Sequence, residues 1–280
     1  MGLHDSAMLV KLTVRKWDGF AKDKRVSKHV DHIFKTAGNV GNYNKRIIDK
    51  AILDPANQIC HSLYSEHTRL TIPWCYDGVG LLPSKLFMEY TKLMRDGAHR
   101  LEQAVDNLAQ QMPIYKANQA ARLGDLYDPE DYPDSKELRE KYEITYKFFP
   151  VPQEGHFIVN MEAEHHERLK QELRDTLAKT EKSALHTLYD RVLTMTEHVV
   201  ERLSDPKHIF RESLVENLYQ LAQNLPKLNV FDDHVLTEIA KDLNDKVLIA
   251  TADELRTNLT VRAQVAAAAE EISQRLRDRM

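Results

Sequence analysis

Near the start of the chain, apolar residues alternate with polar ones, which is the pattern of a half-buried β-strand. Within residues 7–17, Val10, Leu12 and Val14 fall on one face, and polar side chains separate them. Such alternation of β-branched and polar residues favours a strand. Apolar residues then recur at helical spacing from residue 26 to about 37, so a helix is predicted there.

A second helical pattern begins near Asn42 and continues to about Arg69. Asp54-Pro55 marks a boundary or a kink within it, because the residue before a proline avoids the α region. Residues 71–83 then combine two prolines and two glycines with several large apolar side chains. Because such side chains need burial, we expect an ordered loop or a short hairpin here, not a flexible linker.

Two long segments, 84–122 and 162–203, carry apolar stripes at helical spacing. Pro113 breaks or kinks the first segment. A helix rises about 1.5 Å per residue, so roughly 40 residues of the second segment would span about 60 Å. We therefore expect the two segments to pack lengthwise as a long antiparallel helical hairpin. Its expected buried side chains are Leu93, Leu101, Leu108, Leu188, Val192 and Val199.

A β-hairpin is predicted between the two long helices, at 143–160, with strands over 143–150 and 156–160. In the C-terminal quarter, Pro226 is expected to separate two shorter helices, and a third follows. These three helices are predicted at 208–224, 231–247 and 252–279.

These elements predict an α-rich α+β fold. It consists of a long antiparallel helical hairpin, a small antiparallel β element and a C-terminal helical cap. Three segments are expected along the chain. Residues 1–83 form a basic N-terminal region of strand and helices, 84–204 form the long hairpin with the β-hairpin inserted in it, and 205–280 form the C-terminal helical region.

Composition agrees with a helical protein of the cytoplasm. The chain has 280 residues, of which 42% are hydrophobic and 29% charged, and its 9 Gly and 10 Pro are few for an all-β or disordered protein. No apolar run approaches the roughly 18 residues of a membrane span, and we expect neither a signal peptide nor a membrane partner. Cys60 and Cys75 provide no disulfide framework, which fits a reducing compartment.

The net charge of −4 conceals a strong asymmetry. Residues 1–50 hold 11 Lys and Arg against 5 Asp and Glu, whereas the rest holds 28 against 38. Cations interleaved with aromatic residues are typical of proteins that bind single strands, because they neutralise phosphates and stack bases. The basic region would thus contact single-stranded or duplex DNA, or dock on the acidic surface of another subunit. The candidate nucleic-acid-binding residues are Lys11, Arg15, Lys16, Trp17, Lys22, Lys24, Arg25, Lys28, Lys45 and Arg46.

Motifs for catalysis are lacking in the sequence. It contains no P-loop, dinucleotide-binding, nucleophile-elbow or zincin pattern. The strongest metal-like cluster lies at 156–167, where Glu162 and His165 have the E-x-x-H spacing of di-iron bundles. Such a site needs a second E-x-x-H pair, which is missing, so acids at a helix N-terminus are the simpler interpretation. We expect no catalytic residues, no metal and no cofactor.

Six sequence blocks extend over nearly the whole chain in a fixed order. They are MGLHDSAMLVKLTVRKWDG, KDKRVSKHV, GNYNKRIIDK, TIPWCYDGVGLLP, FFPVP and FRESLVENLYQLAQNLPKLNV. Together these blocks resemble a widespread family of uncharacterised phage, prophage and integrative-element proteins. The resemblance implies a mobile-element protein in the cytoplasm of a bacterial host cell. It implies no particular activity and transfers no site residues.

The function expected from these observations is non-enzymatic. The protein would form a homo-oligomer and act on or beside nucleic acid, in replication, recombination or evasion of host defence. A first alternative is a helical adaptor that binds only protein, such as a phage or host factor or an ATPase. A second is a metal-dependent enzyme that uses the cluster at 156–167.

Overall fold

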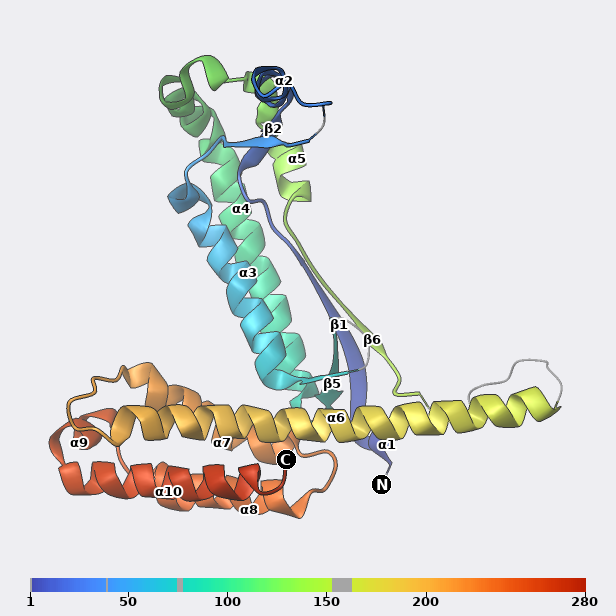
Figure 1. Ribbon diagram of the computed structural model, residues 1–280, viewed down its shortest axis with the longest axis vertical. Coiled ribbons are helices and arrows are strands. Elements are labelled where there is room, and N and C mark those ends of the chain that lie inside the picture. The colour runs from blue at the N-terminus through green and yellow to red at the C-terminus, as the bar shows by residue number, and fades with distance from the viewer. Residues whose placement is uncertain (1, 39, 75–77, 153–162) are drawn as a thin grey trace. The chain divides into compact units, whose positions relative to one another are not determined.

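The computed structural model describes residues 2–38, 40–74, 78–152 and 163–280. It is rich in helices and contains two small antiparallel sheets (Figure 1). The helices of the described part are α1 (Leu3–Ser6), α2 (Lys24–Ile33), α3 (Lys50–Leu70), α4 (Phe87–Leu123), α5 (Ser135–Glu140), α6 (Ala163–Leu203), α7 (Glu212–Leu228), α8 (His234–Asp242), α9 (Ala252–Thr257) and α10 (Leu259–Arg277). Shorter helical turns lie at Ser84–Leu86, Gly124–Leu126, Pro129–Asp131 and Leu243–Val247.

The larger sheet has the strand order β4-β5-β1-β6. Its strands are β1 (Ala7–Arg15), β4 (Ile72–Pro73), β5 (Val79–Pro83) and β6 (Glu143–Phe149). β5 pairs antiparallel with both β1 and β4. Gly80 is required in β5 because a Cβ there would lie 2.5 Å from the hydroxyl oxygen of Thr71. The smaller sheet is a ribbon of β2 (Phe20–Asp23) and β3 (Tyr43–Arg46).

The chain divides into two compact units, each assembled from separate stretches of sequence. Unit 1 contains residues 1–11, 67–90 and 147–280, and unit 2 contains 12–66 and 91–146. The predicted segment boundaries at 83 and 204 do not coincide with the boundaries of these units.

Unit 2 is built on an antiparallel helical hairpin of α3 and α4, which lie side by side in Figure 1. Buried side chains of α3, including Leu53 and Cys60, share one core with Leu101 and Leu108 of α4. A glycine allows the close approach: a Cβ on Gly97 would lie 2.3 Å from a methyl carbon of Leu63. The helices of this hairpin are long because burial along one face stabilises each of them.

Unit 1 is built on a second antiparallel pair, α6 and α10 (Figure 1). Leu188 and Val192 of α6 and Ile272 of α10 are buried in this unit. The hydroxyl of Ser273 in α10 donates a hydrogen bond of 2.7 Å to the hydroxyl oxygen of Thr196 in α6. Helices α7 and α8 pack on each other in the same unit. Their apolar faces therefore add to the core of unit 1.

A buried arginine terminates α6. Arg262 of α10 is 4% exposed, and its Nε donates to the carbonyl oxygen of Leu203 over 2.9 Å. Its Nη2 donates to three further carbonyl oxygens, those of Arg202, Asp205 and His208, over 2.7, 2.7 and 2.9 Å. The last carbonyls of a helix lack partners within it, and its C-terminus favours positive charge. Arg262 therefore caps α6.

The structure confirms the α-rich fold class, with a long antiparallel helical hairpin, a small antiparallel sheet and C-terminal helices. The two long helices expected over 84–122 and 162–203 are present as α4 and α6. The hairpin partner of α4 is α3, however, and that of α6 is α10. Most of the expected core positions are buried: Leu101, Leu108, Leu188, Val192 and Val199. Leu93 is only partly buried.

Three expected helix boundaries are wrong. The helix expected from Asn42 begins only at Lys50, because residues 43–46 pair with β2 as a strand. Pro226 does not end a helix but lies in the last turns of α7. The helix expected over 252–279 is two helices, because the Asn258 side chain accepts hydrogen bonds from two backbone N–H groups and begins α10.

Two further expectations concern the region around residue 156. The first predicted strand of the β-hairpin is present as β6. The second strand, 156–160, lies outside the described residues, as do the side chains of the cluster at 156–166. Among the described residues, none of the helices combines the length and apolar character needed to cross a bilayer.

Candidate nucleic-acid interface

The β2–β3 ribbon of unit 2 has two chemically different faces. Its register pairs Phe20 with Arg46 and Lys22 with Asn44, and these four side chains alternate onto the same face. Phe20 is 41% exposed, and Lys22 and Asn44 are also exposed. The guanidinium carbon of Arg46 lies 4.3 Å from the centre of the Phe20 ring, a cation–π contact. We call Phe20, Lys22, Asn44 and Arg46 the ribbon face.

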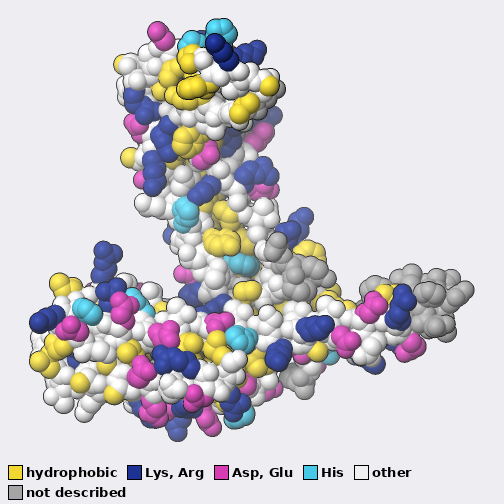
Figure 2. Space-filling view, in the orientation of Figure 1, with side chains coloured by type: hydrophobic (Ala, Val, Ile, Leu, Met, Phe, Trp, Pro, Cys, Tyr) yellow, Lys and Arg dark blue, Asp and Glu magenta, His cyan; other side chains and the backbone are white. Residues whose placement is uncertain are grey.

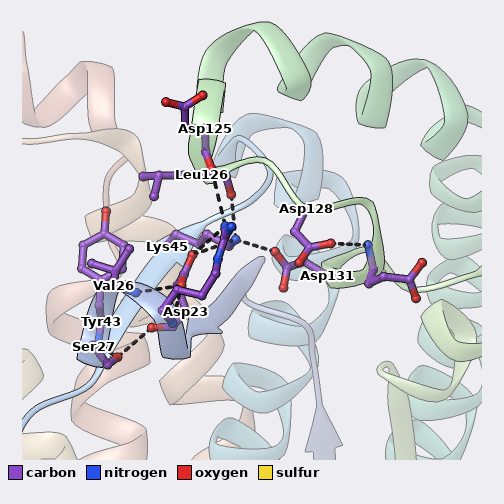
Figure 3. Close-up of polar contacts among 11 residues, drawn as sticks. Asp23, Val26, Ser27, Tyr43, Lys45, Asp125, Leu126, Asp128 and Asp131 are labelled. Carbon is purple, nitrogen blue, oxygen red and sulfur yellow. Dashed lines mark hydrogen bonds and ion pairs between the residues drawn. The ribbon is translucent and has the colours of Figure 1, made fainter. Parts of the chain in front are cut away.

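The opposite face of the ribbon is packed around Lys45 (Figure 3). The Lys45 ammonium lies 3.1 Å from an Asp23 carboxylate oxygen and 2.7 Å from one of Asp131. It also donates a hydrogen bond of 2.7 Å to the carbonyl oxygen of Leu126. An ammonium has three N–H donors, and three acceptors surround this one. Lys45 therefore connects the ribbon to the segment 124–131 through a hydrogen bond and an ion pair.

The charges of this buried cluster reinforce one another. Hydrogen bonding from the Val26 backbone N–H lowers the pKa of Asp23, against the effect of burial, and Lys45 lowers it further. Burial alone would lower the pKa of Lys45, but hydrogen bonds with Asp131 and Asp23 outweigh that and raise it. The amine remains protonated and fully partnered. It therefore lacks the free electron pair that a nucleophilic or Schiff-base lysine needs.

Helix α2 begins at the same cluster and presents cations to solvent. A carboxylate oxygen of Asp23 accepts hydrogen bonds from the N–H groups of Arg25 and Val26, over 2.9 and 3.0 Å, so Asp23 is the N-cap. None of the residues of α2 is buried. Lys24, Arg25 and Lys28 are exposed, and Figure 2 shows apolar side chains beside Lys, Arg and His over this helix.

Two of the ten residues predicted to bind nucleic acid are buried. Trp17 is 6% exposed and belongs to the core of unit 2, so its ring is not available for stacking on a base. Lys45 is 4% exposed and occupied by Asp23 and Asp131, so it cannot neutralise a phosphate. The pairing of β2 with β3 places Lys45 on the inner face of the ribbon, whereas Trp17 follows the end of β1 and packs in the core of unit 2.

The remaining predicted cations are accessible but differ in their partners. Arg15 forms an ion pair of 2.6 Å with Glu143, and the Lys16 amine lies 2.7 Å from His61 Nε2. Lys11 is exposed but belongs to unit 1, whereas the other nine predicted residues belong to unit 2. The exposed predicted residues that the structure groups together are Lys22, Lys24, Arg25 and Lys28, with Arg46 partly exposed.

Three aromatic residues of this region that are not among the ten predicted binding residues are exposed. Phe34 is 72% exposed, Phe20 41% and Tyr43 38%. Phe34 continues an apolar stripe with Val30 and Ile33, and such a stripe normally indicates a buried helix face. The sequence does contain one signal that this apolar stripe is exposed. The ten residues of α2 include three cations, and a core helix carries fewer charges.

Two other features of the described residues bear on possible chemistry. Among the described residues, no group of three His, Cys, Asp or Glu side chains is placed to hold a metal ion. His67 of unit 1 is buried, its Nδ1 lies 2.9 Å from the Tyr90 hydroxyl, and burial lowers its pKa to about 4. His67 is therefore a neutral core residue at physiological pH.

Comparisons with known proteins return no match to this chain: none of the family models, curated proteins or solved structures searched is similar to it.

Proposed function

We propose that the protein is a non-enzymatic nucleic-acid-binding protein that also self-associates, of the kind carried by phages and mobile elements. The observation that carries the proposal is the ribbon face, where an exposed aromatic ring lies between cations. The preferred ligand is a single strand, because only unstacked bases can lie on Phe20.

Charge on α2 supports the same ligand. Lys24, Arg25 and Lys28 are exposed on the helix that directly follows β2, so they extend the positive charge of Lys22. Phosphates attract such cations without regard to base identity. The protein would therefore bind with little sequence preference. This would suit a role in replication, recombination or evasion of host defence.

The proposal is tested by fluorescence anisotropy with single-stranded and duplex DNA over a range of salt concentrations. Affinity should be higher for the single strand and should fall with salt. Phe20→Ala removes one stacking platform. It should weaken binding by about 1–3 kcal/mol, or roughly fivefold to a hundredfold.

A matched pair of charge variants provides the control. Lys22→Gln with Lys28→Gln removes two phosphate contacts, which should reduce the slope of log affinity against log salt by about 1.4 for a single strand. Lys179→Gln with Lys182→Gln makes the same change of net charge at exposed positions of α6 and should leave the slope unchanged. No affinity at low salt, or equal effects of the two pairs, would reject the proposal and favour the protein-only adaptor.

A further inference from the structure

A groove of unit 1 combines apolar and acidic side chains. One wall is a face of α7 and the other is the segment 248–254, and the groove has a volume of about 610 Å³. Tyr219 and Ile249 line it and are 52% and 50% exposed. Its carboxylates come from Glu212, Glu216 and Glu254, and its lining residues include no lysine or arginine. We call it the α7 groove.

Two carboxylates of the α7 groove lack a counterion. Glu212 and Glu216 are exposed, and within the described part of the chain neither side chain forms an ion pair or a hydrogen bond. They lie four residues apart on one helix, and like charges at this spacing repel each other. A cation from another molecule would relieve that repulsion. The groove therefore favours a partner that presents a cation beside an apolar side chain.

The segment that leads into α7 has this character. Burial alternates along it, because Ile209 and Arg211 are exposed while Phe210 between them is 6% exposed. Ile209 is 89% exposed, and Arg211 has no ion-pair partner among the described residues. Both line a second hollow, of about 390 Å³, whose lining includes Arg202 and no carboxylate. The apolar side chain and the cation therefore share one surface, and we call Ile209 and Arg211 the 209–211 edge.

We propose that the 209–211 edge of one molecule docks in the α7 groove of a second copy of this chain. Ile209 would pack against Tyr219 and Ile249, which are all exposed in the single chain. The Arg211 guanidinium would face the carboxylates of Glu212 and Glu216. The association would bury apolar surface and would neutralise charges that lack a counterion within the described chain.

The geometry of this contact is head to tail. A helix turns by about 100° per residue, so Glu212, Glu216 and Tyr219 lie on one side of α7, and Ser213 and Asn217, which line the second hollow, lie on another. The contact joins two different surfaces, so the association is heterologous and continues into rings or filaments. One short segment in one groove is a small contact, which predicts reversible association. The inference rests on the self-association part of the proposed function and does not require nucleic acid.

The test reverses each charge separately and then both together in one chain. Arg211→Glu or Glu216→Lys alone places like charges opposite each other, which should weaken association by about tenfold or more. The chain that carries both substitutions restores opposite charges across the contact and should associate again. Lys179→Glu, at an exposed position of α6, makes the same change of net charge as Arg211→Glu and should leave association unchanged. Light scattering without nucleic acid, over a range of protein concentrations, measures the mass of each.

The outcomes separate this contact from other forms of self-association. Each substituted position is exposed, so every variant should keep the circular dichroism spectrum of the unmodified protein. A folded double variant that stays a single chain, or single variants that associate like the unmodified protein, would overturn this contact but leave self-association standing. A single-chain mass for the unmodified protein at every concentration would overturn both. None of the substitutions alters the ribbon face, so the DNA experiment tests nucleic-acid binding independently.

Discussion

Among the described residues, Lys45 of unit 2 and Arg262 of unit 1 are both buried cations, and their partners are of different kinds. Lys45 in unit 2 lies between two carboxylates and a carbonyl, and Arg262 in unit 1 lies among four carbonyls at the end of α6. Arg262 forms more hydrogen bonds, but every acceptor is neutral. The number of hydrogen bonds therefore does not decide which of the two residues contributes more to the free energy of unfolding. What matters is the charge that remains buried when the cation is removed.

The largest loss of stability is expected for Lys45→Met. The substitution keeps the length of the side chain but leaves Asp23 and Asp131 without their counterion. Breaking a buried pair in this way costs about 3–5 kcal/mol of the free energy of unfolding. Urea denaturation should show this loss, and adding Asp23→Asn and Asp131→Asn should restore part of it. Equal stability of Lys45→Met and the unmodified protein would mean that the cluster is accessible to water.

The two units should also differ in their response to acid. Burial lowers the pKa of His67 in unit 1 to about 4, from about 6.5 in the unfolded chain, so the unfolded state binds more protons between these values. Unit 1 should lose stability as the pH falls from about 6.5 to 4, by about 3 kcal/mol in total. The pKa of Asp23 in unit 2 is lowered from 3.8, so the stabilisation by this group persists until the pH falls below that value.

The two tryptophans of the chain allow the acid response of each unit to be measured separately. Trp17 is buried in unit 2 and Trp74 in unit 1, so Trp17→Phe and Trp74→Phe each leave one fluorescent probe. Between pH 7 and pH 5, the urea midpoint reported by Trp74 should fall more than that reported by Trp17. His67→Gln should reduce the difference. Parallel shifts of both probes would show instead that the units unfold together.

A smaller loss of stability is expected for Arg262→Met. The carbonyl groups that lose their donor are neutral, and His208 and Asp205 lie in an exposed stretch that water can reach. We expect a loss of about 2–3 kcal/mol, below that of Lys45→Met, because hydrogen bonds to a charged group contribute about 1.5–3 kcal/mol and do not add fully. The Trp74 probe should detect it, and Arg262→Lys should recover part of it. A larger loss than for Lys45→Met would contradict the comparison.

The amphipathic patterns of the sequence were sufficient to predict the first strand and the two long helices, and the large apolar side chains of 71–83 indicated an ordered loop or a short hairpin there. The stripe of a helix shows that one face packs, but the partner is set by distant residues. The stripe of α6 therefore predicted Leu188 and Val192 as buried without identifying α10 as the neighbour. A stripe also cannot distinguish a buried face from an exposed one, as α2 illustrates.

Prediction of the candidate interface was limited by strand pairing. Lys22 and Lys45 look equivalent in sequence, but the register of β2 with β3 places one in solvent and the other in the core. The acceptors of Lys45 include Leu126, 81 residues further along the chain, so local sequence carries no signal for that contact. Trp17 was misassigned for a similar reason, because its core partners come mostly from α3 and α4.

The interleaving of the two units sets the order in which they become complete during translation. Every residue of unit 2 has been synthesised once the ribosome passes residue 146, before any of α6 exists. Unit 1 contains the first eleven residues and must wait for α10, which lies at the opposite end of the sequence. Because chains acquire structure as they emerge, unit 2 can fold while the first strand of unit 1 still lacks its final neighbours. Messages truncated shortly after residue 146 would therefore encode all of unit 2 and only a fragment of unit 1.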